Sequence, residues 1–162
     1  MNDEAFLRRA IALSAEAAAT PGSEPFGAVV VKDGKVVGEG FNRSRARHDP
    51  TSHGETEAIR DACARLATLD LSGCALFSSC EPCALCVAAM QIAGIGRVAY
   101  AASLADSAAA LAAVPADKRR GGDVAALRRE AGAPIGQGRI PARQALVAEA
   151  VAVLEAWARA PA

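Results

Sequence analysis

Two short motifs that lie far apart in the chain constrain its fold and chemistry more than any other feature. The first is His53–Glu55, which reads His-Gly-Glu, and the second is Pro82–Cys86, which reads Pro-Cys-Ala-Leu-Cys. One imidazole and two thiolates can hold Zn²⁺ at three positions and leave the fourth open to water. Zinc lowers the pKa of such a water to about 7, so hydroxide is available at neutral pH. The two motifs therefore predict a zinc site of the catalytic type.

Each motif falls where a helix is expected to begin, because apolar residues at helical spacing follow both. Helix N-termini carry partial positive charge, which favours thiolate over thiol at Cys83 and Cys86. We therefore expect His53, Cys83 and Cys86 to be the metal ligands. Glu55 follows the histidine by two positions, an offset that directs its carboxylate to the open side of the metal. We expect Glu55 to take a proton from the water and to deliver it to the substrate.

The same residues allow other interpretations. Cys83-x-x-Cys86 at a helix start also suits a thiol–disulfide redox pair, although such a pair requires no His-x-Glu motif. His48 is an alternative fourth ligand that would close the zinc site and make it structural. Glu57 suits a helix N-terminal acid favoured by the helix dipole alone. Three further cysteines are not needed as ligands and suit small core residues or a strand end; they are Cys63, Cys74 and Cys80.

The composition favours one soluble domain in a reducing compartment. The 162 residues suffice for a single domain over 1–162 with a buried core. Eighteen Lys and Arg balance eighteen Asp and Glu, so no overall field attracts nucleic acid or an acidic membrane. The five cysteines are an odd number, which argues against a secreted disulfide framework, and no apolar run reaches the ~18 residues of a membrane span. We expect a cytoplasmic protein without a membrane partner.

The periodicity of apolar residues predicts an α/β/α three-layer domain built on a mixed sheet. An Asp33–Gly34 turn joins two expected strands into a hairpin, and the later strands alternate with crossover helices. The expected strands are 28–31, 36–41, 74–79 and 97–101, and the expected helices are 3–19, 53–67, 83–93, 105–114 and 141–159. In the helix over 83–93, Leu85, Ala89 and Ile92 are expected to face the core. Residues 43–52 are expected to form an exposed loop, and 115–140 partly a linker.

The motifs and their surroundings resemble the cytidine deaminase-like superfamily. His53–Glu55 and Ser79–Cys86 resemble the superfamily motifs, and Pro25–Gly34, Asn42 and Asp49–His53 resemble its bacterial guanine deaminase branch. The resemblance runs from residue 3 to about 106. It implies a five-stranded mixed sheet, one zinc per chain and hydrolytic loss of ammonia from a base. It also implies a homodimer in which a swapped C-terminal segment, about 115–162, covers the neighbouring active site.

Carried over by position, the resemblance implies three substrate contacts. Phe26 would line the pocket or stack on the base, Asn42 would hydrogen-bond the ring, and the backbone at Gly54 would approach the substrate closely. Gly54 stands where these relatives have alanine. The residues by themselves also allow simpler roles, because Asn42 can merely end a strand and Phe26 can belong to the core.

Two features of guanine-deaminating relatives are missing from this chain. Those relatives carry a second acid shortly after the last strand, whereas residues 110–114 here read Ala-Leu-Ala-Ala-Val. The nearest acids are Asp106 and Asp117, and Asp106 is the candidate substrate contact. The relatives also carry an aromatic residue at the extreme C-terminus, where this chain ends in Arg159–Ala162 (Arg-Ala-Pro-Ala).

We therefore expect zinc-dependent hydrolytic deamination of a small molecule, either a free nucleobase or a related amino-heterocycle. Guanine is the first substrate to test, followed by cytosine, guanosine and amino-triazines. One alternative is deamination of adenosine in tRNA, which requires a basic surface such as Arg43, Arg45, Arg47 and the run 118–120. The balanced total charge makes a nucleic-acid partner the less favoured expectation. A second alternative is a non-catalytic zinc-binding interaction module.

Overall fold

The computed structural model describes residues 3–115 and 123–160, and its central element is a four-stranded mixed sheet. The strands are β1 (Glu24–Lys32), β2 (Lys35–Asn42), β3 (Ala75–Cys80) and β4 (Arg97–Ala102), in the order β2-β1-β3-β4. β1 runs antiparallel to both of its neighbours, whereas β3 and β4 are parallel. The hairpin predicted at Asp33–Gly34 is confirmed.

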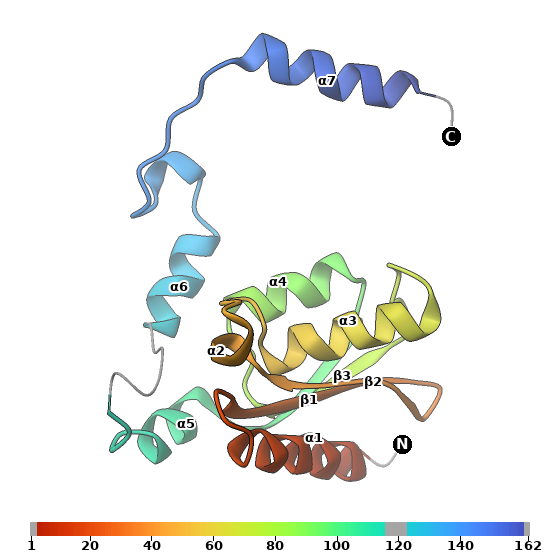
Figure 1. Cartoon of the computed structure of the whole chain (residues 1–162), viewed down its shortest axis with the longest axis vertical. Helices are drawn as coiled ribbons and strands as arrows, with labels where there is room; N and C mark the ends of the chain where they lie inside the picture. Colours follow the sequence, from red (N-terminus) through yellow and green to blue (C-terminus); the bar gives the residue numbers. More distant parts are fainter. Residues whose placement is uncertain (1–2, 116–122, 161–162) are drawn as a thin grey trace. The chain divides into compact units, whose positions relative to one another are not determined.

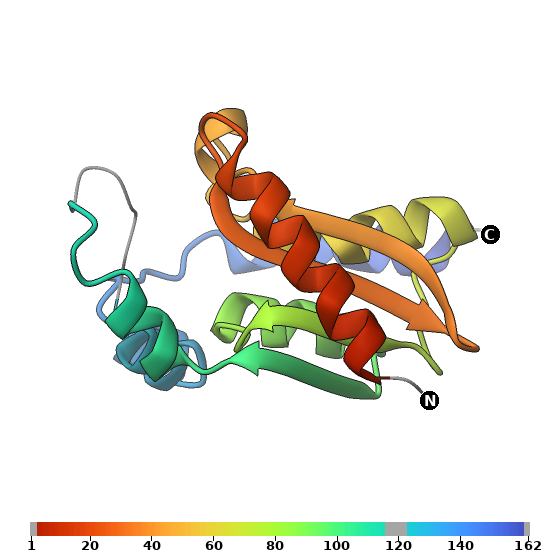
Figure 2. The ribbon, with the colours of Figure 1, turned by 90° about the horizontal axis from the view of Figure 1, so that it is seen from below.

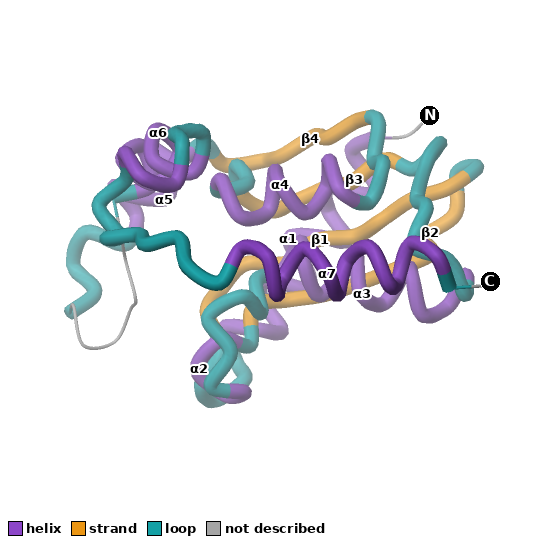
Figure 3. Tube along the Cα trace, turned by 90° about the horizontal axis from the view of Figure 1, so that it is seen from above, coloured by secondary structure: helices purple, strands orange, loops and turns teal. Residues whose placement is uncertain are grey.

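Helices cover both faces of this sheet, so the predicted α/β/α layering is confirmed (Figures 1 and 2). Helix α1 (Asp3–Ala18) packs on one face, and α3 (Gly54–Leu66) and α4 (Ala84–Ile92) pack on the other. Figure 3 shows α4 running along the strands, and α3 contacts α4 on the same face. The termini of α3 and α4 that carry the two motifs lie at the same end of the sheet.

The expected fifth strand is not found among the described residues. After β4 the chain turns directly into a short helix, α5 (Leu104–Ala110). Ser103 and Asp106 form a capping box at its start, in which each side chain bonds the backbone N–H of the other residue. An alanine-rich segment behind such a cap favours helix over strand, so β4 stays at the edge of the sheet.

Other predicted boundaries also need correction. The expected loop 43–52 contains a one-turn helix, α2 (Ser44–Arg47), and the expected linker 115–140 contains α6 (Val124–Ala131) and a 3₁₀ turn, η1 (Ile135–Gln137). The helix expected over 141–159 begins only at α7 (Val147–Arg159). Leu146 precedes it with a left-handed backbone (φ 59°), which interrupts a right-handed helix.

The inward face of α4 differs from the prediction. Ala89 packs against the core as predicted, but Ile92 is 87% exposed, and the buried residues of this region are Cys86, Met90 and Ala93. Residues three and four apart share one face of a helix, so the rotation that directs Cys86 toward the ligand site also directs Met90 into the core. The metal-site residue therefore decides which apolar side chains of this helix can pack.

Two glycines of β2 allow α3 to lie unusually close to the sheet. A Cβ atom built on either Gly38 or Gly40 would overlap the backbone of Ala58. Ala58 and Ala62 themselves are completely buried and belong to the larger core cluster. Because both partners lack bulky side chains, the backbones of β2 and α3 approach each other directly. This close approach sets the position of the α3 N-terminus, where His53 lies.

The chain divides into two compact units, and the boundary between them along the sequence falls between Val124 and Ala125. The larger unit contains the sheet and helices α1–α5, and the smaller unit contains α7, η1 and most of α6. Within the described residues no helix combines the length and apolar character that crossing a membrane requires. Helix α7 carries large exposed apolar side chains, including Leu154 (66% exposed) and Trp157 (80% exposed).

We expect Gly40→Ala to destabilise the protein by about 1–3 kcal/mol, because the added methyl group overpacks the contact between β2 and α3. Urea denaturation measures the change. Gly96→Ala is the matched control, since a Cβ at Gly96 meets no atom within 4 Å. Equal stabilities of the two variants would contradict the close-packing argument.

Candidate metal centre and active site

The predicted metal ligands come together at two helix N-termini. His53 is the N-cap residue of α3 and Cys83 is the N-cap residue of α4, each with extended backbone. Cys86 lies three residues after Cys83, one helical turn further along the same face. The orphan N–H groups of both helix starts therefore surround the three side chains with positive partial charge.

The spacing of the three ligand atoms fits a tetrahedral zinc ion. The Sγ atoms of Cys83 and Cys86 are 3.7 Å apart, and each lies 3.6 Å from Nδ1 of His53. Bond lengths of about 2.3 Å to sulfur and about 2.0 Å to nitrogen give edges of roughly 3.8 Å and 3.6 Å in a tetrahedron. Among the described residues, these three form the group that is close enough to share an ion. His48 is exposed and does not belong to it.

The electrostatics of the three side chains also favour the binding of a cation. Hydrogen bonds from Cys86 and His53 lower the pKa of Cys83 to about 4. The same hydrogen bond with Cys83, together with burial, raises the pKa of Cys86. Two thiolates 3.7 Å apart in a poorly solvated site repel each other, so the pair shares one proton when no cation is present. A dication between the sulfurs offsets that repulsion, and the donor set therefore fits zinc.

Glu55 lies beside the ligands without being one of them. Its side chain is buried, and one carboxylate oxygen, Oε2, lies 3.4 Å from Sγ of Cys86. The hydroxyl of Ser78 donates a hydrogen bond of 3.2 Å to the other oxygen, Oε1. Burial raises the pKa of Glu55, because the charged carboxylate is less well solvated inside the protein than in water. This placement suits the predicted proton carrier.

Sequence reasoning missed Ser78. Ser78 lies on β3, whose six residues are all buried. Its only signal in the sequence was the presence of two hydroxyl residues, Ser78 and Ser79, in a strand that was expected to be buried. A buried hydroxyl needs a hydrogen-bond partner, and here that partner is Glu55. The neighbouring Ser79 accepts a hydrogen bond of 3.0 Å from the backbone N–H of Gly27, which links β3 to the start of β1.

Asn42 occupies the end of β2 and is 4% exposed. Its side-chain oxygen Oδ1 accepts hydrogen bonds of 3.0 Å from both the backbone N–H and the hydroxyl of Ser44. Because a backbone N–H can only donate, these bonds fix the orientation of the amide. The Nδ2 group therefore points away from the turn as a donor. Asn42 ends the strand, as one interpretation expected, and still presents an amide donor at this end of the sheet.

The other three candidate contacts differ in their surroundings. Phe26 is half-buried and belongs to neither core cluster. A Cβ on Gly54 would lie only 2.8 Å from the carbonyl oxygen of Phe26, so the start of α3 packs directly on this strand. Asp106 is exposed, and its carboxylate accepts hydrogen bonds from the backbone and hydroxyl of Ser103 at 2.9 and 2.6 Å. Asp117 lies outside the described residues.

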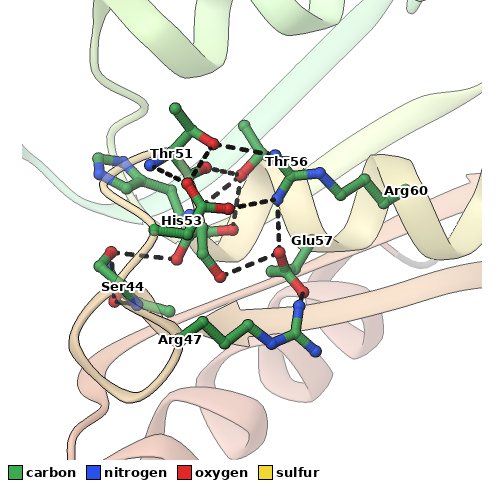
Figure 4. Close-up of polar contacts among 10 residues, drawn as sticks. Ser44, Arg47, Thr51, His53, Thr56, Glu57 and Arg60 are labelled. Atoms are coloured by element: carbon green, nitrogen blue, oxygen red, sulfur yellow. Dashed lines mark hydrogen bonds and ion pairs between the residues drawn. The ribbon is translucent and has the colours of Figure 1, made fainter.

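The segment between Asn42 and His53 is held in place by a charge network centred on Glu57 (Figure 4). Glu57 accepts from Arg47 of α2 and from Arg60 of α3 at 2.6 Å each, and from the hydroxyl of Ser52 at 3.0 Å. The Glu57 side chain is only 11% exposed. Glu57 therefore does more than complement the helix dipole, because it ties the preceding segment to α3.

A second set of bonds fixes His53 itself (Figure 4). The hydroxyl of Thr56 accepts a hydrogen bond of 3.0 Å from the backbone N–H of His53 and donates to the carbonyl of Thr51 at 2.5 Å. The expected exposed loop is thus an ordered connection between a candidate substrate contact and a candidate metal ligand. Charge-assisted and capping bonds of this kind restrict the backbone on both sides of the site.

Comparison with known proteins agrees with this geometry. The family model of the cytidine and deoxycytidylate deaminase zinc-binding region matches residues 1–102. Guanine deaminase of Bacillus subtilis (strain 168) is 38% identical over 157 residues, which are 97% of this chain and 94% of that protein. An X-ray structure of guanine deaminase from Bacillus subtilis superposes with a TM-score of 0.85 at 37% identity, covering 99% of this chain and 96% of the other.

A second kind of relative matches less of the chain. The tRNA-specific adenosine deaminase of Aquifex aeolicus (strain VF5) is 38% identical over 102 residues, which are 63% of this chain and 67% of that protein. That match leaves more than a third of this chain uncovered, whereas the match to the guanine deaminase covers nearly all of it.

We expect the protein to bind about one zinc ion per chain and to lose it as the pH falls, because both cysteines must be thiolates to coordinate the metal. The affinity should fall by about tenfold per pH unit for each proton that binding releases. Zinc release to a colorimetric chelator between pH 8 and pH 5 measures this. Cys83→Ser should release the metal at a higher pH, whereas Cys63→Ser, which lies outside the ligand group, should behave as wild type. A release curve independent of pH would exclude the thiolate site.

Proposed function

Because this chain belongs to the cytidine and deoxycytidylate deaminase zinc-binding family and is a hydrolytic deaminase, we propose that it removes ammonia from a free nucleobase, with guanine as the first candidate. The observation that carries the proposal is the ligand triangle of His53, Cys83 and Cys86 with the buried carboxyl of Glu55 against it. Guanine is preferred because the similarity to a guanine deaminase extends over nearly the full length. Cytosine, guanosine and amino-triazines are the next candidates.

In the proposed reaction, water replaces the exocyclic amine of a ring carbon, and ammonia leaves. The chemistry that Zn²⁺ supplies when bound is acidification of water at neutral pH. Glu55 accepts the proton that the water loses and delivers it to the ring nitrogen beside the attacked carbon. Glu55 then transfers the remaining proton of the added water from its oxygen to the departing amine. Its carboxylate is thereby restored after each turnover. Ser78 positions this carboxylate through its hydrogen bond to Oε1.

The proposed substrate contacts lie at the end of the sheet next to the ligands. Phe26 offers an aromatic surface, Asn42 offers its Nδ2 donor, and Gly54 allows the strand and the helix start to come together around the ring. Asp106 is the least suited of the four expected contacts, since its carboxylate would have to release the cap of α5 before it could reach a substrate.

Deamination of tRNA is less well supported than deamination of a free base, because two of the arginines expected to bind RNA contact other side chains of this chain. Arg47 is paired with Glu57 at 2.6 Å, and the guanidinium of Arg43 lies over the ring of Phe41, 4.4 Å from its centroid. The run 118–120 lies outside the described residues. A non-catalytic zinc module would not need a buried Glu55 against the ligands. A reducing, cytoplasmic setting suits the five free cysteines.

We expect the wild type to release ammonia from guanine, and Glu55→Gln to reduce kcat by about 10²–10⁴-fold while it retains zinc, because the amide cannot carry the proton. A coupled ammonia assay over free bases, nucleosides and triazines measures activity, and atomic absorption measures zinc. Glu4→Gln, which removes an exposed ion pair on α1, is the control. Full activity of Glu55→Gln would exclude the proposed mechanism. Absence of ammonia from every compound would exclude the function.

We further propose a homodimer in which residues from about 115 to 162 form the exchanged segment. Large apolar residues line α7 and remain exposed within one chain, and burial of such a helix face against a partner is favourable. Light scattering should therefore give twice the chain mass. Substituting both Leu154 and Trp157 by Ser should shift the population towards monomer, whereas Arg159→Ser should not. A monomeric wild type would exclude the exchange.

A further inference from the structure

Glu24 lies at the same end of the sheet as the candidate active site. It is the first residue of β1, and in the antiparallel pairing with β2 it stands directly opposite Asn42. Paired residues in adjacent strands share one face of the sheet. Phe41 packs into the cluster on the α1 face, so its neighbour Asn42, and with it Glu24, belongs to the face covered by α3. His53 is the N-cap of that helix.

The backbone of Glu24 is held rigidly in this place. The following residue is Pro25, which restricts the residue before it to extended conformations. The carbonyl of Pro25 accepts a hydrogen bond of 2.9 Å from the hydroxyl of Ser14 on α1. On its other side, Glu24 pairs with β2. A side chain on such a fixed strand is preorganised for recognition, in contrast to one on an unrestrained loop.

The burial and the charge of Glu24 suit its carboxylate to accept a hydrogen bond. Glu24 itself is half-buried, which strengthens any hydrogen bond that its carboxylate makes. Neither the metal site nor the proton transfer described above uses this acid.

The chain also lacks an acid where guanine-deaminating relatives carry their second one. The segment 110–114 is Ala-Leu-Ala-Ala-Val, and Asp106 is engaged in the cap of α5. A substrate with N–H groups on its ring edge needs an acceptor in the pocket, because an unpaired buried donor is costly. Among the described residues, Glu24 is an acid placed on the correct face and at the correct end of the sheet to supply that acceptor.

We propose that Glu24 is a specificity-determining residue whose carboxylate accepts a hydrogen bond from a ring N–H of the substrate, beside a carbonyl oxygen that the Nδ2 group of Asn42 binds. The pair Glu24 and Asn42 then recognises a lactam edge, the O=C–N–H unit of an oxo-heterocycle. This inference rests on the proposed deaminase function and narrows its substrate class. In guanine, the carbon that bears the amine is flanked by two ring nitrogens. One receives the proton from Glu55, and the other carries the N–H next to the carbonyl.

Two purines that share the reacting amine test the inference. Guanine presents the lactam edge, whereas 2,6-diaminopurine presents an unprotonated ring nitrogen that a carboxylate repels. We expect Glu24→Ala to lower kcat/KM for guanine by about 10- to 100-fold and to raise that for 2,6-diaminopurine, because the variant loses both the acceptor and the repulsion. Glu24→Gln offers an amide donor, so it should lower kcat/KM for guanine and raise that for 2,6-diaminopurine. Glu4→Gln, an exposed acid on α1, should change neither.

Each outcome is decisive. A shift of the guanine to 2,6-diaminopurine ratio, at unchanged zinc content and thermal midpoint, supports the inference. An unchanged ratio, or an equal loss on both purines, overturns it and leaves the deaminase function intact. A wild type that releases no ammonia from any base overturns the proposed function, and the inference with it. If the two variants do not fold, Glu24→Asp keeps the charge and should keep the preference for guanine at a lower kcat/KM, and loss of that preference overturns the inference.

Discussion

The repulsion between the sulfurs of half-buried Cys83 and buried Cys86 is the interaction on which the rest of this structure depends. The Sγ atoms of Cys83 and Cys86 lie 3.7 Å apart. The surrounding protein lowers the pKa of Cys83 but raises that of Cys86, so it stabilises only one of the two thiolates. The N-termini of α3 and α4 reduce the cost by directing positive partial charge at the site. A metal cation between the sulfurs would offset the remaining electrostatic repulsion. Folding, metal binding and the placement of Glu55 are therefore energetically coupled.

The scaffold meets this requirement by bringing backbones unusually close together. Glycines at positions 38 and 40 let α3 lie directly on β2, and Gly54 lets the start of α3 lie on β1 at Phe26. Each close contact shortens the distance between a strand that carries a candidate substrate contact and a helix that carries a ligand. An alanine at position 54 would require these backbones to separate slightly, because a Cβ here would lie 2.8 Å from a carbonyl oxygen.

The connection from Asn42 to His53 shows how charged residues can build a site without taking part in its chemistry. Glu57 accepts hydrogen bonds from Arg47 and Ser52 of this connection and from Arg60 of α3, so Arg47, one of the arginines that suggested a nucleic-acid surface, serves to fix this connection. The same end of the sheet carries Glu24 opposite Asn42, which places an acceptor beside a donor. In the proposed reaction, specificity depends on residues brought together by strand pairing, whereas reactivity depends on residues at the helix N-termini.

The sequence by itself predicted the candidate metal ligands, the candidate proton carrier and the layered α/β/α architecture, because these depend on local spacing: His-x-Glu, Cys-x-x-Cys and apolar periodicity. Only the tertiary structure decided what depends on contacts between distant residues. Ser78 reaches Glu55 across 23 positions, Glu24 meets Asn42 through strand register, and Cys86 sets the rotation of α4 so that Met90, not Ile92, enters the core. The four-stranded sheet was decided in the same way, since the fifth strand that the resemblance implied is not found among the described residues and a capping box begins α5 directly after β4.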